Sequence, residues 1–270
     1  MSIDRLRAHY GFSRMPFSKD LAPGMLHAHR AHEEAVARIS WCVSESAIGV
    51  VTGECGSGKT VAARAAASAL DPSRHSVIYL GTPAIGARGT YSAIVSALGG
   101  RARFHCASLI PQCQDLLARE VAERRKQPVV ILDEAHLLDA TTLDGLRCLA
   151  NIDMDSKPVC MLLLGQPTLR RRLRLGAFAA LDQRVGLRYQ LSGLDVSECQ
   201  SYIAHHLALA GRKDTLFSDD AIALVHQGSR GLPRAINNLA VQSLVAAFAA
   251  NKGIVDESSA RQALAEVNAE

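Results

Sequence analysis

The chain lacks the features that mark membrane, secreted and repeat proteins. Its apolar runs, such as residues 159–164, are far too short to cross a bilayer, and its first residues contain no apolar signal core. The seven cysteines are odd in number and include no C-x-x-C pair, so we expect free thiols in a reducing compartment rather than a disulfide framework. No internal repeat or coiled-coil heptad is present. We therefore expect a cytoplasmic protein of 270 residues with no membrane partner.

The sequence also has no convincing site for a transition metal and little excess charge. His27, His29 and His32 lie in a loop-like segment, and His205 and His206 are adjacent, so neither group has the i, i+4 spacing with which two imidazoles share an ion. The net charge of +4 is too small to demonstrate nucleic-acid binding by itself. Zinc is therefore not expected, and a nucleic-acid partner needs other support.

A glycine-rich segment joins an apolar run to an alanine-rich one. Residues 48–52 predict a buried strand, and the segment from Lys59 onward predicts a helix. Glycines in the intervening turn allow amide groups to face a phosphate, Lys59 brings positive charge to the terminal phosphates, and Thr60 offers a hydroxyl to Mg²⁺. The predicted nucleotide-binding residues are Gly53, Glu54, Cys55, Gly56, Ser57, Gly58, Lys59, Thr60 and Val61.

A second motif supplies the carboxylates that such a loop requires. Residues 129–132 are wholly apolar and predict a strand buried in a parallel sheet, with Asp133 at its carboxyl end. Asp133 is expected to hold Mg²⁺ together with Thr60. Glu134 is expected to act as the general base that polarises the attacking water. With the loop, this motif predicts hydrolysis of a nucleoside triphosphate, in which Lys59 and Glu134 take part.

Strands and helices alternate along the central part of the chain. A strand over residues 76–80 and helices near 88–98 and 108–126 are predicted between the two motifs, and a strand over 159–164 follows them. This alternation is typical of an α/β fold with a parallel sheet. Gln166 follows the last of these strands, where it is positioned to sense the γ-phosphate or to orient the water.

Residues 46–240 resemble the AAA+ ATPases, and within them the ExeA-type group, which also includes ATPases encoded beside transposases. The resemblance implies a three-layer AAA+ P-loop NTPase fold with a small C-terminal all-α lid, ATP and Mg²⁺ as cofactors, and self-association into a ring or helical oligomer. The residues that carry it are Tyr10-Gly11-Phe12, Met15-Pro16-Phe17, His32-Glu33-Glu34-Ala35, the phosphate loop, Leu132-Asp133-Glu134-Ala135-His136, Leu164-Gly165-Gln166-Pro167, Leu181-Asp182-Gln183-Arg184-Val185 and residues 231–238.

Two arginines acquire roles through this resemblance. Arg184 matches the arginine finger, which reaches the nucleotide of a neighbouring subunit, and Arg234 matches the second sensor, which contacts the γ-phosphate of its own subunit. A guanidinium is always protonated and can neutralise charge that develops on phosphoryl oxygens. Each could instead be an ordinary surface arginine. If Arg184 acts in trans, an isolated monomer should hydrolyse ATP slowly.

Capping signals divide the chain into three parts: an N-terminal segment over residues 1–45, the nucleotide-binding α/β domain over 46–190, and the helical lid over 191–270. Asp195-x-x-Glu198 is a capping box that predicts a helix through Leu209. Ser218 predicts the start of a second lid helix, Pro233 that of a third, and a short final helix fits residues 257–267.

The arginine run Arg170-Arg171-Arg172-Leu173-Arg174 is denser than a folded core needs. It could neutralise DNA phosphates with little sequence preference, in which case Arg170, Arg171 and Arg174 are the candidate DNA-binding residues. Alternatively, these arginines form ion pairs between subunits or a solvated helix face. The sequence leaves both interpretations open.

Three functions compete. In the first, the protein is a transposition accessory ATPase that oligomerises on duplex DNA and presents a target to a partner transposase. In the second, it is an assembly factor of the secretion type, whose relatives continue into a membrane helix; the sequence ends at Glu270 without one, and we therefore expect the first function. The third is a nucleotide-dependent scaffold that does not bind DNA.

Overall fold

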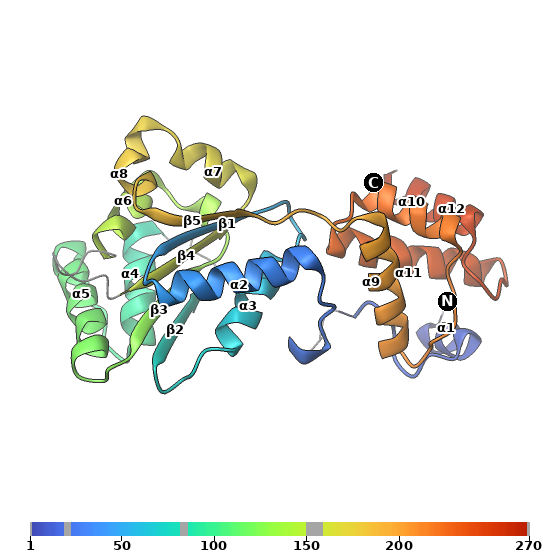
Figure 1. Ribbon diagram of the computed structural model, residues 1–270, viewed down its shortest axis with the longest axis horizontal. Helices are drawn as coiled ribbons and strands as arrows, with labels where there is room; N and C mark the ends of the chain where they lie inside the picture. The colour runs from blue at the N-terminus through green and yellow to red at the C-terminus, as the bar shows by residue number, and fades with distance from the viewer. Residues whose placement is uncertain (1, 19–22, 82–85, 150–158, 269–270) are drawn as a thin grey trace. The chain divides into compact units, whose positions relative to one another are not determined.

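The computed structural model describes residues 2–18, 23–81, 86–149 and 159–268. The chain divides into two compact units (Figure 1). Unit 1 comprises residues 1–31, 55–58 and 192–270, and unit 2 comprises residues 32–54 and 59–191. The first 31 residues therefore share a unit with the C-terminal helices, whereas the sequence analysis grouped them in a separate segment over residues 1–45.

Unit 2 is built on a parallel sheet of five strands in the order β2-β3-β4-β1-β5. The strands are β1 (Ile48–Thr52), β2 (His75–Leu80), β3 (Gln127–Leu132), β4 (Cys160–Gly165) and β5 (Val185–Gln190). The first four agree with the strands predicted from apolar runs. The fifth was not predicted, because its buried and exposed residues alternate at an edge of the sheet and leave no continuous apolar run.

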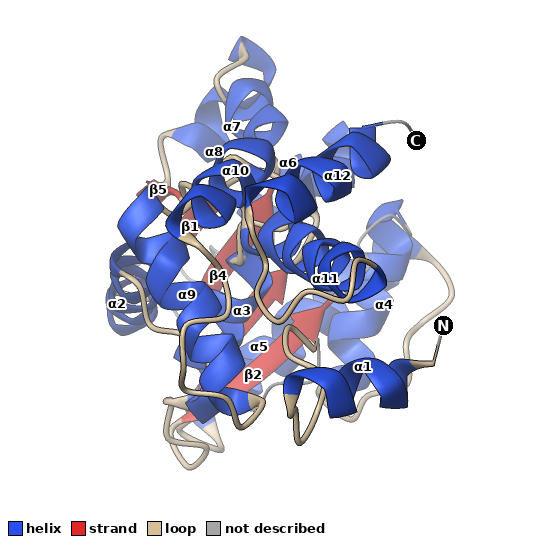
Figure 2. Ribbon diagram, turned by 90° about the vertical axis from the view of Figure 1, so that its right-hand side faces the viewer, coloured by secondary structure: helices blue, strands red, loops and turns tan. Residues whose placement is uncertain are grey.

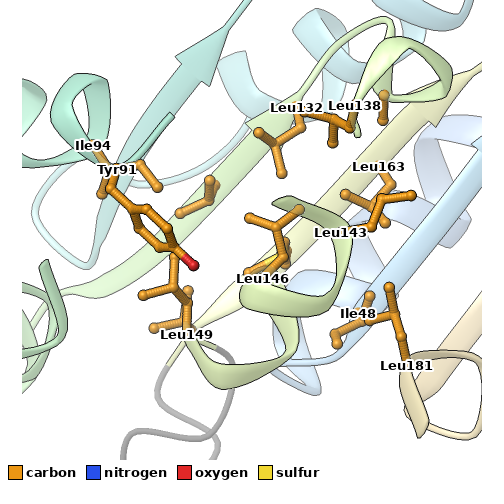
Figure 3. Packing of buried hydrophobic residues seen from close by; sticks show 14 of the residues in the cluster. Ile48, Tyr91, Ile94, Leu132, Leu138, Leu143, Leu146, Leu149, Leu163 and Leu181 are labelled. Atoms are coloured by element: carbon orange, nitrogen blue, oxygen red, sulfur yellow. The ribbon is translucent and has the colours of Figure 1, made fainter. Parts of the chain in front are cut away.

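Helices cover both faces of this sheet and make three layers (Figure 1). On one face, Val129, Ile131 and Leu162 pack with side chains of α2 (Arg30–Ser44) and α3 (Lys59–Ser68). On the other, Val130 and Leu132 pack with α4 (Gly86–Ala97), α5 (Cys106–Ala122) and α6 (Ala140–Leu149), as Figure 3 shows for Leu132. Because neighbouring residues of a strand point to opposite faces, the continuous apolar strands are buried on both sides. The predicted three-layer α/β fold is confirmed.

Short elements connect the strands at the carboxyl edge of the sheet. A 3₁₀ turn, η2 (Ala135–Leu137), follows β3, and α7 (Pro167–Leu173) follows β4. Another 3₁₀ turn, η3 (Gly176–Phe178), and α8 (Ala179–Asp182) then lead to β5. In a parallel sheet all strands end at the same edge, so the motifs after β1, β3 and β4 are brought to one side of unit 2.

Unit 1 is helical (Figure 2). Its elements are α1 (Ile3–Tyr10), η1 (Pro23–Met25), α9 (Val196–Leu209), α10 (Asp219–Ser229), α11 (Pro233–Ala249) and α12 (Glu257–Asn268). Leu6, Tyr10 and Phe12 share one apolar core with α9, α10 and α11, which explains why the first residues belong to this unit. The helical C-terminal region agrees with the expected lid.

The helix starts predicted in unit 1 are confirmed by their caps. Asp195 Oδ1 accepts a hydrogen bond from Glu198 N at 2.8 Å, and the Glu198 carboxylate accepts one from Asp195 N at 3.0 Å. Ser218 Oγ accepts a bond from Ala221 N at 3.2 Å. These side chains satisfy amide groups that a helix start leaves without a partner.

Candidate functional site

Lys59 opens helix α3, and its charged group is held at the phosphate loop. The side chain is buried, with 6% of its surface exposed. Its Nζ donates hydrogen bonds to Gly53 O and Glu54 O, both at 2.9 Å. A buried ammonium requires acceptors, and here the loop carbonyls serve. Phosphate oxygens are stronger acceptors for a cation, so the same position suits the terminal phosphates of a nucleotide.

The turn between β1 and α3 has the backbone of an anion cradle. Gly56 and Gly58 have φ values of +80° and +98°, a region that costs little only for glycine. Between them, the Ser57 hydroxyl is buried and forms no hydrogen bond with any described residue. A buried hydroxyl without a partner is costly, so a ligand that bonds to it is favoured. The loop therefore fits a polyphosphate.

The two predicted magnesium ligands lie side by side. Asp133 Oδ2 accepts a hydrogen bond from Thr60 Oγ1 at 2.6 Å and another from the Tyr79 hydroxyl at 2.8 Å, while Asp133 Oδ1 accepts one from Glu134 N at 2.9 Å. Asp133 is 4% exposed. Hydroxyl and carboxylate oxygens are the donors that Mg²⁺ prefers. Chain segments 73 residues apart thus bring together a donor set that fits this ion.

Tyr79 is a site residue that the sequence analysis missed. It lies on β2 opposite Ile131 of β3, near the carboxyl ends of both strands. Burial and the hydrogen bond to Asp133 raise the pKa of its hydroxyl to about 12, so it acts as a donor. The sequence signal for Tyr79 is its place near the carboxyl end of β2. This place indicates a contact with Asp133 only when β2 is known to pair with β3.

His136 lies between the Glu134 side chain and the Gln166 backbone. Glu134 has left-handed backbone angles (φ 52°, ψ 34°), and its carboxylate lies 3.3 Å from His136 Nδ1. The backbone N–H of Gln166 points at the same nitrogen from 3.5 Å. One ring nitrogen can donate to the carboxylate or accept from the amide, but not both. His136 therefore bonds either to the predicted base or to the backbone of the predicted sensor, a role that the sequence analysis did not assign.

Of the two arginines with roles from the resemblance, Arg184 is not brought to this cluster, whereas Arg234 contacts the phosphate loop. Arg184 is exposed just before β5, where its guanidinium donates to Arg147 O at 3.4 Å. This is the amino-terminal edge of the sheet, opposite the edge that carries Asp133. In unit 1, Arg234 is exposed at the start of α11; its N–H donates to Gly56 O at 3.3 Å, and its guanidinium lies 3.3 Å from Cys55 Sγ.

The arginine run forms most of α7 and divides into two groups. Arg170 donates to the Gln190 side chain at 3.2 Å, and Arg172 donates to His136 O at 2.7 Å. Arg171 and Arg174 are exposed. Arg172 therefore supports the turn after Glu134, while the two exposed arginines are available for a partner. Within the described ranges, no helix is both long and apolar enough to span a bilayer.

Comparisons with known proteins agree with this geometry. Residues 43–173 match the family described as "AAA domain". General secretion pathway protein A of Aeromonas hydrophila is 32% identical over 244 residues, which cover 89% of this chain and 44% of that protein. The chain thus spans less than half the length of this relative.

Solved structures with the same fold include two Aeropyrum pernix proteins. The ORC2 protein in ADPNP-ADP complexes has a TM-score of 0.66 at 20% identity, with 93% of this chain and 70% of that chain covered. The ORC1 protein in complex with DNA has a TM-score of 0.65 at 16% identity, with 90% and 67% covered. At these identities the likeness concerns the fold alone. Together, these comparisons show that residues 43–173 are similar to the AAA domain family, that the chain is similar to General secretion pathway protein A over part of that protein's length, and that unit 2 has the P-loop NTPase fold.

Proposed function

We propose that the protein hydrolyses ATP in a Mg²⁺-dependent reaction at the edge of the sheet formed by the ends of β1, β3 and β4. The observation that supports this proposal most directly is the hydrogen bond of 2.6 Å between Thr60 and Asp133, next to the buried Lys59. When bound, Mg²⁺ neutralises phosphate charge and polarises the bond that is cleaved. Thr60 and Asp133 would hold the ion, and Lys59 and the loop amides would bind the phosphates.

Glu134 is the proposed general base, and His136 positions its carboxylate. The Glu134 side chain is 43% exposed, so water has access to it. An ionised carboxylate accepts a proton from water as the water attacks phosphorus. Gln166 follows β4 at the same edge, from which its amide is suited to orient that water. Arg234 would stabilise charge on the terminal phosphate.

Activity is proposed to require self-association. Because Arg184 lies at the opposite edge of the sheet from Asp133, it is far from the catalytic residues of its own unit 2. An exposed arginine in this position suits the nucleotide of a neighbouring copy. The catalytic centre would then be shared in a ring or a helical filament.

Three variants test the reaction by release of phosphate and by calorimetric titration of ATP. Lys59→Ala should lose ATP binding, and Glu134→Gln should bind ATP but turn it over 10²–10⁴-fold more slowly, the usual contribution of a general base. Arg184→Ala should bind ATP without hydrolysing it. Mixing Arg184→Ala with Lys59→Ala should restore part of the activity, and failure of this rescue would contradict a shared site.

For the process that hydrolysis drives, we propose assembly on duplex DNA and regulation of a partner transposase. Arg171 and Arg174 support DNA binding, because both are exposed and lie within or directly after α7, which follows β4 at the catalytic edge. A protein of the same fold was solved in complex with DNA. Phosphate contacts by arginine confer affinity with little sequence preference. ATP binding and hydrolysis would form and dissolve the assembly.

A second candidate is an assembly factor for secretion, which the likeness to General secretion pathway protein A favours. Gel-shift measurements with duplex DNA and a slowly hydrolysed ATP analogue separate the two candidates. Binding that is strengthened by the analogue, weakens with salt and loses this strengthening in the Arg171→Gln, Arg174→Gln double variant supports the DNA function. ATPase activity without any DNA binding at low salt would favour the secretion candidate.

A further inference from the structure

A basic depression lies at the edge of the sheet where β2 and β3 begin. It has a volume of about 470 Å³ and opens widely to solvent. In Figure 1 the loops that precede β2 and β3 lie on the same side of unit 2, and the register pairs His75 with Gln127 at the first residues of the two strands. The depression is lined by Ser46, Arg74, His75, Val121, Arg125, Lys126 and Gln127.

The lining offers hydrogen-bond donors and positive charge, with no carboxylate. Arg74, Arg125 and Lys126 form no ion pair with any described residue. Hydrogen bonds from Ser73, followed by the charges of Arg74 and His75, lower the pKa of the nearby Asp71, whereas Glu120 accepts hydrogen bonds from Arg124 and Ser76. Within the described part of unit 2, the charges of Arg125 and Lys126 are therefore not paired, whereas Asp71 offsets part of the charge of Arg74.

Arg125 has a backbone conformation that a lysine or arginine seldom adopts. It follows the end of α5 with a φ of 52°, the left-handed conformation usually taken by glycine after a helix. Any side chain with a Cβ is disfavoured there. The Arg125 side chain forms no hydrogen bond or ion pair with any described residue, and backbone strain at such a residue points to a use for its side chain beyond folding.

We propose that this depression, here called the β2–β3 basic site, binds the phosphodiester backbone of nucleic acid independently of ATP. Two guanidinium groups and an ammonium on an open surface match a chain of phosphates that passes through. Only Val121 supplies apolar surface, so the site lacks a pocket that would select a peptide side chain. The site lies at the opposite edge of unit 2 from Asp133, so it is distinct from the proposed nucleotide site.

Fluorescence anisotropy of the full chain with labelled duplex DNA, without nucleotide, tests this site. The triple variant Arg74→Gln, Arg125→Gly, Lys126→Gln should bind at least tenfold more weakly at low salt, and its slope of log affinity against log salt should fall by about 3. Arg125→Gly alone should keep or raise the melting temperature while it lowers the slope by about 1, because glycine relieves the backbone strain as the charge is removed.

Arg103→Gln is the matched control. It removes one exposed arginine at the other end of α5, a helix of 17 residues and thus about 25 Å long, and it should leave the affinity unchanged. Three outcomes would overturn the proposal: DNA affinity unchanged in the triple variant, binding of labelled polyglutamate but not of DNA, or altered self-association as the variant's only effect. The proposal would also be refuted if the Arg171→Gln, Arg174→Gln double variant lost DNA binding and the triple variant did not. That result would leave the proposed DNA function of Arg171 and Arg174 intact.

Discussion

A buried histidine makes the stability of unit 1 depend on pH in a calculable way. His206 lies on α9 with 3% of its surface exposed, stacked on Phe17 at 5.1 Å between ring centres. Burial, followed by the nearby charges of His205, His27 and Arg14, lowers its pKa from 6.5 to about 4. In the unfolded chain the ring regains its ordinary pKa. Between these two values the unfolded state therefore binds a proton that the folded state does not.

The free energy of unfolding should consequently fall as pH drops from about 6.5 to about 4, and this contribution should be constant above and below that window. At about 1.4 kcal/mol per pKa unit, the full loss is roughly 3 kcal/mol. The variant His206→Leu removes the titrating group and keeps an apolar side chain at the site. Urea denaturation followed by circular dichroism from pH 4 to pH 8 should show a gap between the two proteins that changes by this amount.

Comparison of the wild-type protein with His206→Leu separates the contribution of the histidine to the pH dependence of stability from that of the carboxylates. Hydrogen bonds from Arg212 and from Lys252 lower the pKa values of Asp214 and Asp256, and these groups add their own loss of stability in acid. Both proteins share that loss, so it cancels in the difference. Parallel curves for the two proteins across the window would refute the assignment of a neutral, buried His206.

Substitutions at three further positions test the site and the core. Tyr79→Phe removes a hydrogen bond to Asp133, so the Mg²⁺ concentration for half-maximal ATPase activity should rise about tenfold. An unchanged Mg²⁺ titration would show that Tyr79 does not support the metal site. His136→Ala should lower kcat about tenfold without altering KM for ATP, because it only positions Glu134, and His136→Gln should recover part of the rate. Gly145→Ala should destabilise the fold by about 1–3 kcal/mol in thermal unfolding, because the added Cβ would lie 2.2 Å from the hydroxyl of the buried Tyr91. This clash should outweigh the higher helix propensity of alanine. A raised melting temperature would contradict this packing.

Local chemistry explains why much of the fold could be predicted. The strands β1, β3 and β4 are buried on both faces, so their sequences are continuous apolar runs that indicate their own secondary structure. The starts of α9 and α10 depend on hydrogen bonds within four residues, which a sequence motif records. β5 escaped prediction because an edge strand with one exposed face lacks such a run.

The site residues divide in the same way. Lys59, Thr60 and Asp133 belong to motifs whose spacing indicates their chemistry, so the sequence by itself predicts the class of ligand and the edge of the sheet that would bind it. Only the tertiary structure decided that Tyr79 donates to Asp133, that His136 lies between Glu134 and Gln166, and that Arg74 joins Arg125 and Lys126 at one depression. These relationships depend on the order and register of strands that are distant along the chain, and strand order arises from packing of the whole sheet, which no local motif encodes.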